Sequence, residues 1–121
     1  MKTYSLTVLL LFLYSTAQAQ SDTLTTAQAQ AYIGKTIWIK MYVAELHAGK
    51  NDSPDYLNID KEYPNQTLAI AIFDHNVFKQ KTGYSPQSLV GKTIVCHAKI
   101  TQYKGKTQIS QNDLKKIRTL K

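Results

Sequence analysis

The sequence predicts a mainly β fold in one domain. Its 121 residues leave room for a single hydrophobic core. Apolar and polar residues alternate with period two in several short segments, and residues that favour turns separate those segments. We therefore expect five strands, at residues 36–46, 56–59, 67–73, 92–103 and 107–110.

The first and fourth of these strands carry the clearest alternation. One side of the first strand is expected to face the core with Ile37, Ile39, Met41 and Val43. Its other side carries Trp38, Lys40 and Tyr42. In the fourth strand the lone cysteine, Cys96, falls on the apolar side, so we expect a buried, unreactive thiol.

Two segments without this alternation predict helices. Residues 21–33 predict a short N-terminal helix that ends at Gly34, and residues 76–81 predict a helical connection between the third and fourth strands. The triplets Gly34-Lys35-Thr36 and Gly91-Lys92-Thr93 echo each other, and each glycine is expected to turn the chain from a helical segment into a strand. A phosphate-binding loop needs a further, earlier glycine and leads into a helix, so the triplets do not indicate a nucleotide hydrolase.

The order strand, strand, strand, helix, strand, strand is that of the OB fold, a partly open five-stranded Greek-key barrel. The triplet Lys104-Gly105-Lys106 predicts a tight hairpin between the last two strands. Residues 112–121 predict a short extension that packs Leu114, Ile117 or Leu120 against the end of the barrel. A split-barrel or SH3-like arrangement is the structural alternative, because periodicity does not fix strand pairing.

Residues 1–19 predict a signal peptide. Lys2 is followed by an apolar run at residues 6–14 and by Ala17-Gln18-Ala19, which is the order of a secretory leader. A retained anchor is the alternative, but the run is shorter than the about 20 apolar residues that a spanning helix needs. We expect cleavage after Ala19 and an OB-fold domain at residues 20–121 that is periplasmic or secreted, without stable membrane insertion.

The chain carries a formal net charge of +7, and loss of Lys2 with the leader lowers it to +6. Such a charge attracts phosphate backbones, anionic headgroups or acidic glycans, or simply keeps a surface solvated. No pattern indicates catalysis. His47, His75 and His97 lack the spacing of a metal site, Asp74-His75 lies in a turn, and no serine lies in a nucleophile elbow. We expect no metal, no cofactor and no enzymatic activity.

Five runs in order resemble those of small exported bacterial OB-fold nucleic-acid-binding domains. They are Tyr56-Leu57-Asn58-Ile59, Tyr63-Pro64-Asn65-Gln66, the apolar strand ending at Phe73, Leu89-Val90-Gly91-Lys92-Thr93 and Tyr103-Lys104-Gly105-Lys106-Thr107-Gln108-Ile109. The chain departs from this family at Ala69 and Ala71, where bulkier β-branched residues are common. The resemblance covers the expected mature chain and implies binding rather than catalysis.

An OB fold grips ligands on the outer side of its second and third strands, between two loops. Here those loops are residues 48–54 and 104–106. Single-stranded DNA or RNA needs cations along its phosphates and aromatic faces under its bases. The residues predicted to supply them are Trp38, Lys40, Tyr42, Tyr56, Lys99, Tyr103, Lys104 and Lys106, with Lys50 and Phe73 as further candidates. Trp38 and Tyr42 have a structural alternative, burial under the N-terminal helix or the tail.

A different class of function is also open at this point. OB barrels accept oligosaccharides and partner chains, and export removes a protein from most nucleic acid. The alternative is therefore a periplasmic or secreted module that binds an envelope protein, a peptide or a glycan without catalysis.

Overall fold

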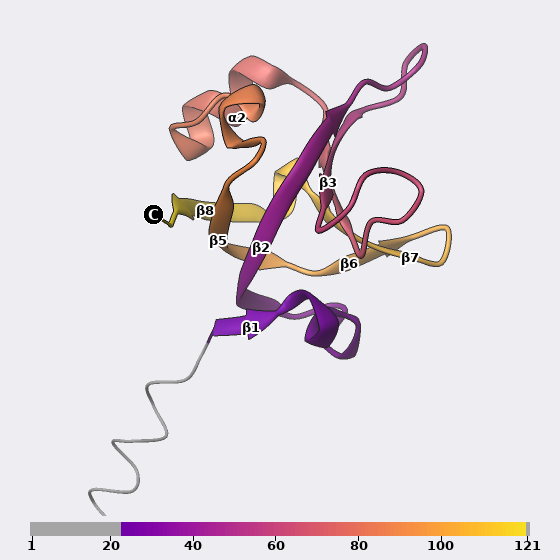
Figure 1. Ribbon diagram of the computed structural model, residues 1–121, viewed down its shortest axis with the longest axis vertical. Coiled ribbons are helices and arrows are strands. Elements are labelled where there is room, and N and C mark those ends of the chain that lie inside the picture. The colour runs from indigo at the N-terminus through magenta and orange to yellow at the C-terminus, as the bar shows by residue number, and fades with distance from the viewer. Residues whose placement is uncertain (1–22, 121) are drawn as a thin grey trace, which may run out of the picture.

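The longest strand, β2 (Thr36–His47), organises the fold. The computed structural model describes residues 23–120, and β2 crosses nearly the whole of this region (Figure 1). One edge of β2 pairs with β5 (Thr93–Lys99) from Thr36 to Tyr42. The other edge pairs with β1 (Thr23–Thr25) near its start and with β3 (Asp55–Ile59) near its end.

The remaining strands extend the sheet on both sides. They are β4 (Ala69–Ile72), β6 (Thr101–Tyr103), β7 (Lys106–Ser110) and β8 (Leu114–Thr119). The order is β6-β7-β4-β3-β2-β5-β8, with β1 on β2, and β4 and β7 run parallel. The prediction of a five-stranded barrel is therefore wrong in its strand number and closure, since eight strands form one mixed sheet.

One of the three additional strands, β6, comes from a break in a longer predicted segment, and a second, β8, comes from the tail. The predicted strand at residues 92–103 is divided at Ile100, whose backbone N–H donates to Lys35 and whose carbonyl accepts from Gly34. The tail forms β8, which pairs with β5, after a short 3-10 helix, η3 (Gln111–Asp113). The register shifts between His97 and Ala98, so core residues of β8 are spaced by three, as Leu114 and Ile117, and not by two.

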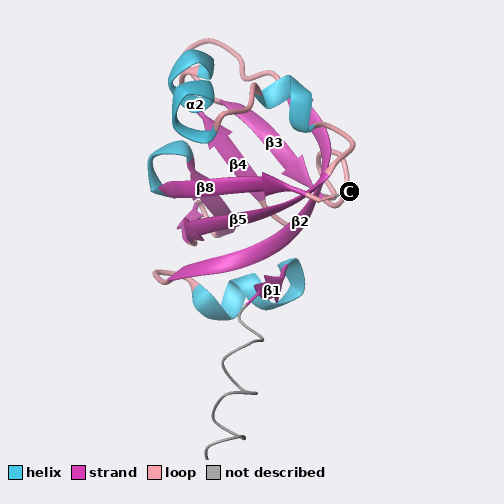
Figure 2. Ribbon diagram, turned by 90° about the vertical axis from the view of Figure 1, so that its left-hand side faces the viewer, coloured by secondary structure: helices cyan, strands magenta, loops and turns pink. Residues whose placement is uncertain are grey.

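The third additional strand, β1, precedes the N-terminal helix. That helix is a 3-10 helix, η1 (Thr26–Tyr32), which the Thr25 N–H caps by donating to Gln28 Oε1. It lies with β1 below β2 in Figure 2, far from α2. Gly34 and Gly91 both have positive φ, 89° and 81°, at the entries to β2 and β5. The predicted role of the two glycines is thus confirmed.

The predicted helical connection is confirmed between β4 and β5. It consists of α2 (His75–Thr82) and a 3-10 helix, η2 (Pro86–Leu89). Asp74 caps α2 by accepting from the Asn76 and Val77 N–H groups, and Gly83 ends it at φ 85°. Phe78 of α2 is fully buried and closes one end of the core.

The core lies between two layers of strands. Ile39 and Met41 of β2 and Ile94 and Cys96 of β5 pack in one cluster with side chains of β3, β4 and β7, such as Ile70. Cys96 is fully buried, as predicted, and its burial raises the pKa of the thiol to about 12. Within residues 23–120 no helix has the length and hydropathy to cross a membrane. The predicted leader, residues 1–19, lies outside the described residues.

Candidate binding groove

A groove of about 840 Å³ crosses the outer face of β3, β4 and β7. Leu57, Ile70 and Ile109 of these strands are in the core, so the residues beside them point to the opposite face. Register places three outward residues in one row, with Asn58 opposite Ala69 and Ala69 opposite Gln108. We call this site the β3–β4–β7 groove.

Ala69 on β4 contributes to the depth of this groove. Ala69 lines it and is 8% exposed, while Ala71, opposite Tyr56, is fully buried. A larger side chain at Ala69 would raise the floor between the residues of β3 and β7. The departure from the resembling family at Ala69 thus leaves the floor of the groove low where a bulkier side chain was expected.

The loop between β2 and β3, residues 48–54, forms one wall. Gly49 N–H donates to Asp55 Oδ1 over 2.8 Å, and His75 Nε2 lies 2.7 Å from Asp55 Oδ2. The backbone N–H of Gly49, with His75 beside it, holds the pKa of Asp55 below its usual value. A side chain at Gly49 would clash with the Pro54 carbonyl oxygen, so this tight loop requires glycine.

A second wall is the loop from β3 to β4. Glu45 Oε2 accepts from the Tyr63 N–H at 2.6 Å and from Asn58 Nδ2 at 2.8 Å, and these bonds lower the pKa of Glu45. Tyr63 stacks on His47 with 5.4 Å between ring centroids. Gln66 Oε1 is buried here without a hydrogen-bond partner among the described residues, which is the kind of acceptor that a water or ligand donor satisfies.

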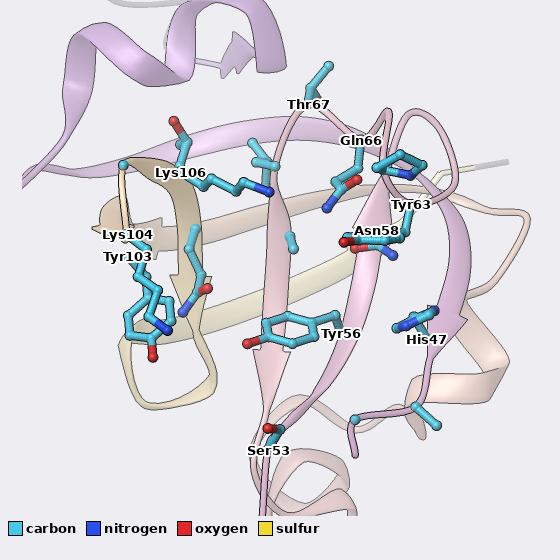
Figure 3. Close-up of a pocket in the computed structure, with 18 of the residues that line it drawn as sticks. His47, Ser53, Tyr56, Asn58, Tyr63, Gln66, Thr67, Tyr103, Lys104 and Lys106 are labelled. Atoms are coloured by element: carbon cyan, nitrogen blue, oxygen red, sulfur yellow. The ribbon is translucent and has the colours of Figure 1, made fainter.

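The hairpin between β6 and β7 forms the third wall. Lys104 and Gly105 have φ of 50° and 79°, which produces the predicted tight turn. Tyr103 is 53% exposed, and Lys104 Nζ lies 5.4 Å from the centre of its ring. Figure 3 shows Tyr56 directed across the groove toward this hairpin, with His47 and Tyr63 on the far side.

The groove has a positive lining. Lys50, Lys104 and Lys106 line it, and among residues 23–120 no Asp or Glu is one of its lining residues. Side chains of one sign in a hollow with low-dielectric walls concentrate their field inside it. This site is therefore suited to an anionic ligand that also offers flat rings or polar edges.

The structure brings together only part of the predicted site. Tyr56, Tyr103, Lys104 and Lys106 line the groove, as does Lys50. The predicted residues outside its lining are Trp38, Lys40, Tyr42 and Lys99, and Phe73 also lies outside. Trp38 is half-buried and stacks on His97 of β5 at 4.7 Å, because the outward side of β2 here belongs to a different face of the sheet.

Several lining residues were not predicted: Asn58, His47, Tyr63, Gln66, Ala69 and Gln108. Asn58 and Ala69 could have been found, because each alternates with core residues in a strand whose outer side binds ligands in OB folds. Tyr63 and Gln66 come from an irregular loop whose path depends on Glu45, a contact that no local pattern encodes.

Comparison with solved structures identifies the fold. No protein-family model and no curated protein matches the chain. An OBody, an OB scaffold bound to hen egg-white lysozyme, is 15% identical, and the match covers 84% of this chain and 93% of that chain with a TM-score of 0.55. The chain thus has an OB fold, and the resemblance seen in its sequence is confirmed at the level of the fold.

Two further similar structures differ in how much of them the chain covers. A candidate nucleic acid-binding lipoprotein from Klebsiella pneumoniae is 17% identical, with 87% of this chain and 96% of that chain covered and a TM-score of 0.43. A candidate aspartyl-tRNA synthetase from Leishmania major is 10% identical with a TM-score of 0.48, and the match covers 83% of this chain but 21% of that chain. Such likeness does not identify a ligand.

Proposed function

We propose that this chain is an OB-fold binding module that holds single-stranded nucleic acid, DNA or RNA, in the β3–β4–β7 groove. The observation that carries the proposal is the composition of the lining: exposed rings and three lysines around a floor of small and amide side chains, without a carboxylate. Cations can follow the phosphates while bases stack on the rings, and each stacked base contributes about 1–3 kcal/mol.

The rings that suit stacking lie on opposite walls. Tyr103 stands on the hairpin, Tyr56 rises from β3, and Tyr63 is 57% exposed on the second wall. Gln66 and Gln108 lie between them, and amides of this kind can donate to or accept from base edges. A single strand can therefore lie along the groove with its bases inward and its phosphates near Lys104 and Lys106.

Fluorescence anisotropy with a labelled oligonucleotide tests the proposal. We expect binding at low salt that weakens steeply as salt rises, because phosphate contacts release counterions. The variant Tyr103→Ala should weaken binding by about tenfold, the equivalent of one stacked base. Phe73→Ala is the matched control, since Phe73 is 57% exposed, close to the 53% of Tyr103, and lies outside the groove lining.

The contribution of the two hairpin lysines can also be tested against a matched control variant. Lys104→Gln/Lys106→Gln should weaken binding and flatten its salt dependence by about 0.7 in the log-log slope for each phosphate that is no longer neutralised. Lys61→Gln/Lys79→Gln removes two exposed lysines outside the groove lining and should leave both unchanged. Absence of binding at low salt, or equal effects of the two pairs, contradicts the proposal.

A second candidate is binding of an envelope protein or a glycan in the same groove. It is favoured by the similar OBody, which is bound to a protein, lysozyme. A pull-down from envelope extract that recovers one stoichiometric partner, lost in Tyr103→Ala and retained in Phe73→Ala, would favour it. Binding of the oligonucleotide with the variant pattern above would favour nucleic acid.

A further inference from the structure

A second face of the sheet gathers basic side chains away from the groove. It is the outward side of β2, β5 and β8, where the intervening residues Ile39, Cys96 and Ile117 point into the core. Strand pairing aligns its residues in rows. Trp38, His97 and Lys116 form one row, and Lys40, Val95 and Arg118 form the next. We call this surface the β2–β5–β8 face.

The cations of this face are close together and unopposed. Lys40, Lys116 and Arg118 are exposed in the two rows, and Lys99 is exposed in a third, opposite Thr36. Neighbouring strands are about 4.8 Å apart, so Lys40 and Arg118, two strands apart, arise about 10 Å from each other. That spacing slightly exceeds the Debye length of about 8 Å at physiological salt but is well within the about 30 Å at 0.01 M salt, so their potentials add mainly at low salt.

No carboxylate within the described region neutralises these groups. The ion pair found among residues 23–120 joins His75 to Asp55, on the other side of the molecule's core. Neither row contains Asp or Glu. Val95 is 3% exposed although it points outward, and its row partners on either side are the long stems of Lys40 and Arg118. The side chains of Lys40 and Arg118 therefore flank a buried hydrophobic residue, Val95.

This face and the groove are on opposite sides of the core. Ile94 and Cys96 of β5 share one hydrophobic cluster with Leu57 and Ile70, which lie under the groove. In Figure 2, β5 and β8 lie in front of β3 and β4. A ligand held in the groove therefore leaves the β2–β5–β8 face free.

The chemistry of the face selects a phosphate backbone over a lipid surface. Peripheral proteins enter the interface of a bilayer with protruding apolar side chains as well as charge. Among the described residues of this face, Tyr42 is the one large hydrophobic residue that is exposed, at 44%, while Trp38 is stacked on His97. A basic surface whose exposed ring is that of Tyr42 fits a nucleic acid that is bound through its phosphates, with few contacts to its bases.

We propose that the β2–β5–β8 face is a second nucleic-acid surface, which holds the backbone of a second strand while the groove holds the first. The proposal rests on the proposed function of the groove in one respect, that the first strand is bound there. It makes the protein a bridge between two strands.

Native mass spectrometry and energy transfer test the bridge. With donor-labelled and acceptor-labelled oligothymidylates at low salt, we expect complexes of one protein with two strands, and transfer between the dyes. Lys40→Gln/Arg118→Gln should abolish the transfer and leave one strand per protein, with affinity for that strand reduced less than about twofold because the remaining site is the groove. The control pair Lys61→Gln/Lys79→Gln should behave like wild type.

The outcomes separate the two sites. If Tyr103→Ala has no effect and Lys40→Gln/Arg118→Gln removes all binding, the groove proposal fails and the face stands as the sole nucleic-acid site. If wild type binds one strand and Lys40→Gln/Arg118→Gln is unchanged, the second site is contradicted. If this variant instead loses binding to vesicles of anionic phospholipid while both strands remain bound, the face serves a lipid surface and the proposal is wrong.

Discussion

The two outer surfaces of this sheet carry similar side chains, yet they differ in shape. The β3–β4–β7 groove is walled by two loops and a hairpin around small residues such as Ala69. The β2–β5–β8 face has rings and cations in rows on three strands that pair side by side. The strands supply the side chains of both surfaces, and the connections between strands form the walls that make one of them a groove.

The largest effect is expected from a substitution that fills the groove. Ala69→Leu places a bulky side chain on the floor between Asn58 and Gln108. Because exclusion of one stacked base costs about 1–3 kcal/mol, affinity for a single strand should fall about tenfold or more in anisotropy. Ala31→Leu, at an exposed position of η1 on another side than the groove-lining Gln30, is the control and should bind like wild type.

Filling the groove should not unfold the protein. Ala69 is 8% exposed at the floor of the groove, so the added atoms can extend into the groove, and the free energy of unfolding in urea titrations should fall by no more than about 1–3 kcal/mol, the usual cost of a larger side chain at a packed position. Full affinity in a folded Ala69→Leu protein would show that the ligand does not use the groove.

A smaller effect is expected from loosening one wall. Asn58 is 1% exposed and donates to Glu45, which also accepts from the Tyr63 N–H. Asn58→Ala removes a buried hydrogen bond and should lower the free energy of unfolding by about 1–3 kcal/mol. Asn112→Ala, an exposed change outside the groove, should cost less than about 0.5 kcal/mol. Equal costs in urea unfolding would mean that Glu45 does not organise this wall.

The smallest expected effect is a dependence on pH at the other wall. Contacts with the Gly49 N–H and His75 lower the pKa of folded Asp55 from 3.8. The stability they contribute is present above pH 3.8 and is lost as pH falls through the lower, folded pKa. The difference in unfolding free energy between wild type and Asp55→Asn should therefore shrink in that range. A difference that stays constant with pH would contradict a role for the ionised carboxylate.

Local sequence patterns predicted the individual strands, turns and helices better than they predicted how the strands pair in the sheet. The alternation in β2 and β5, the glycine turns at Gly34 and Gly91 and the helical connection are properties of neighbouring residues, and the structure confirms them. β8 was predicted as a simple extension because the register shift beside His97 spaces its core residues by three. β1 depends on pairing with a strand that begins beyond η1, which periodicity does not encode.

Only part of the candidate site was predicted, because the residues that gather there also depend on how the strands pair. Tyr103, Lys104 and Lys106 follow from the hairpin, and Tyr56 follows from a strand that the OB fold uses for binding. Trp38 and Lys40 are residue types that suit nucleic acid but lie on another face, since β2 pairs with β5 there and the two strands share that outward side. Sequence alternation identifies the outer side of a strand, and only the assembled sheet shows which outer sides adjoin.

Amide chemical shifts in a titration with oligothymidylate at low salt test the central claim most directly. The first shifts should map to Tyr56, Ala69 and the hairpin at Tyr103 to Lys106, and shifts at Lys40 and Arg118 should follow only at higher strand concentration. Shifts that begin on the β2–β5–β8 face, or a spectrum that does not change, would contradict binding of nucleic acid in the groove.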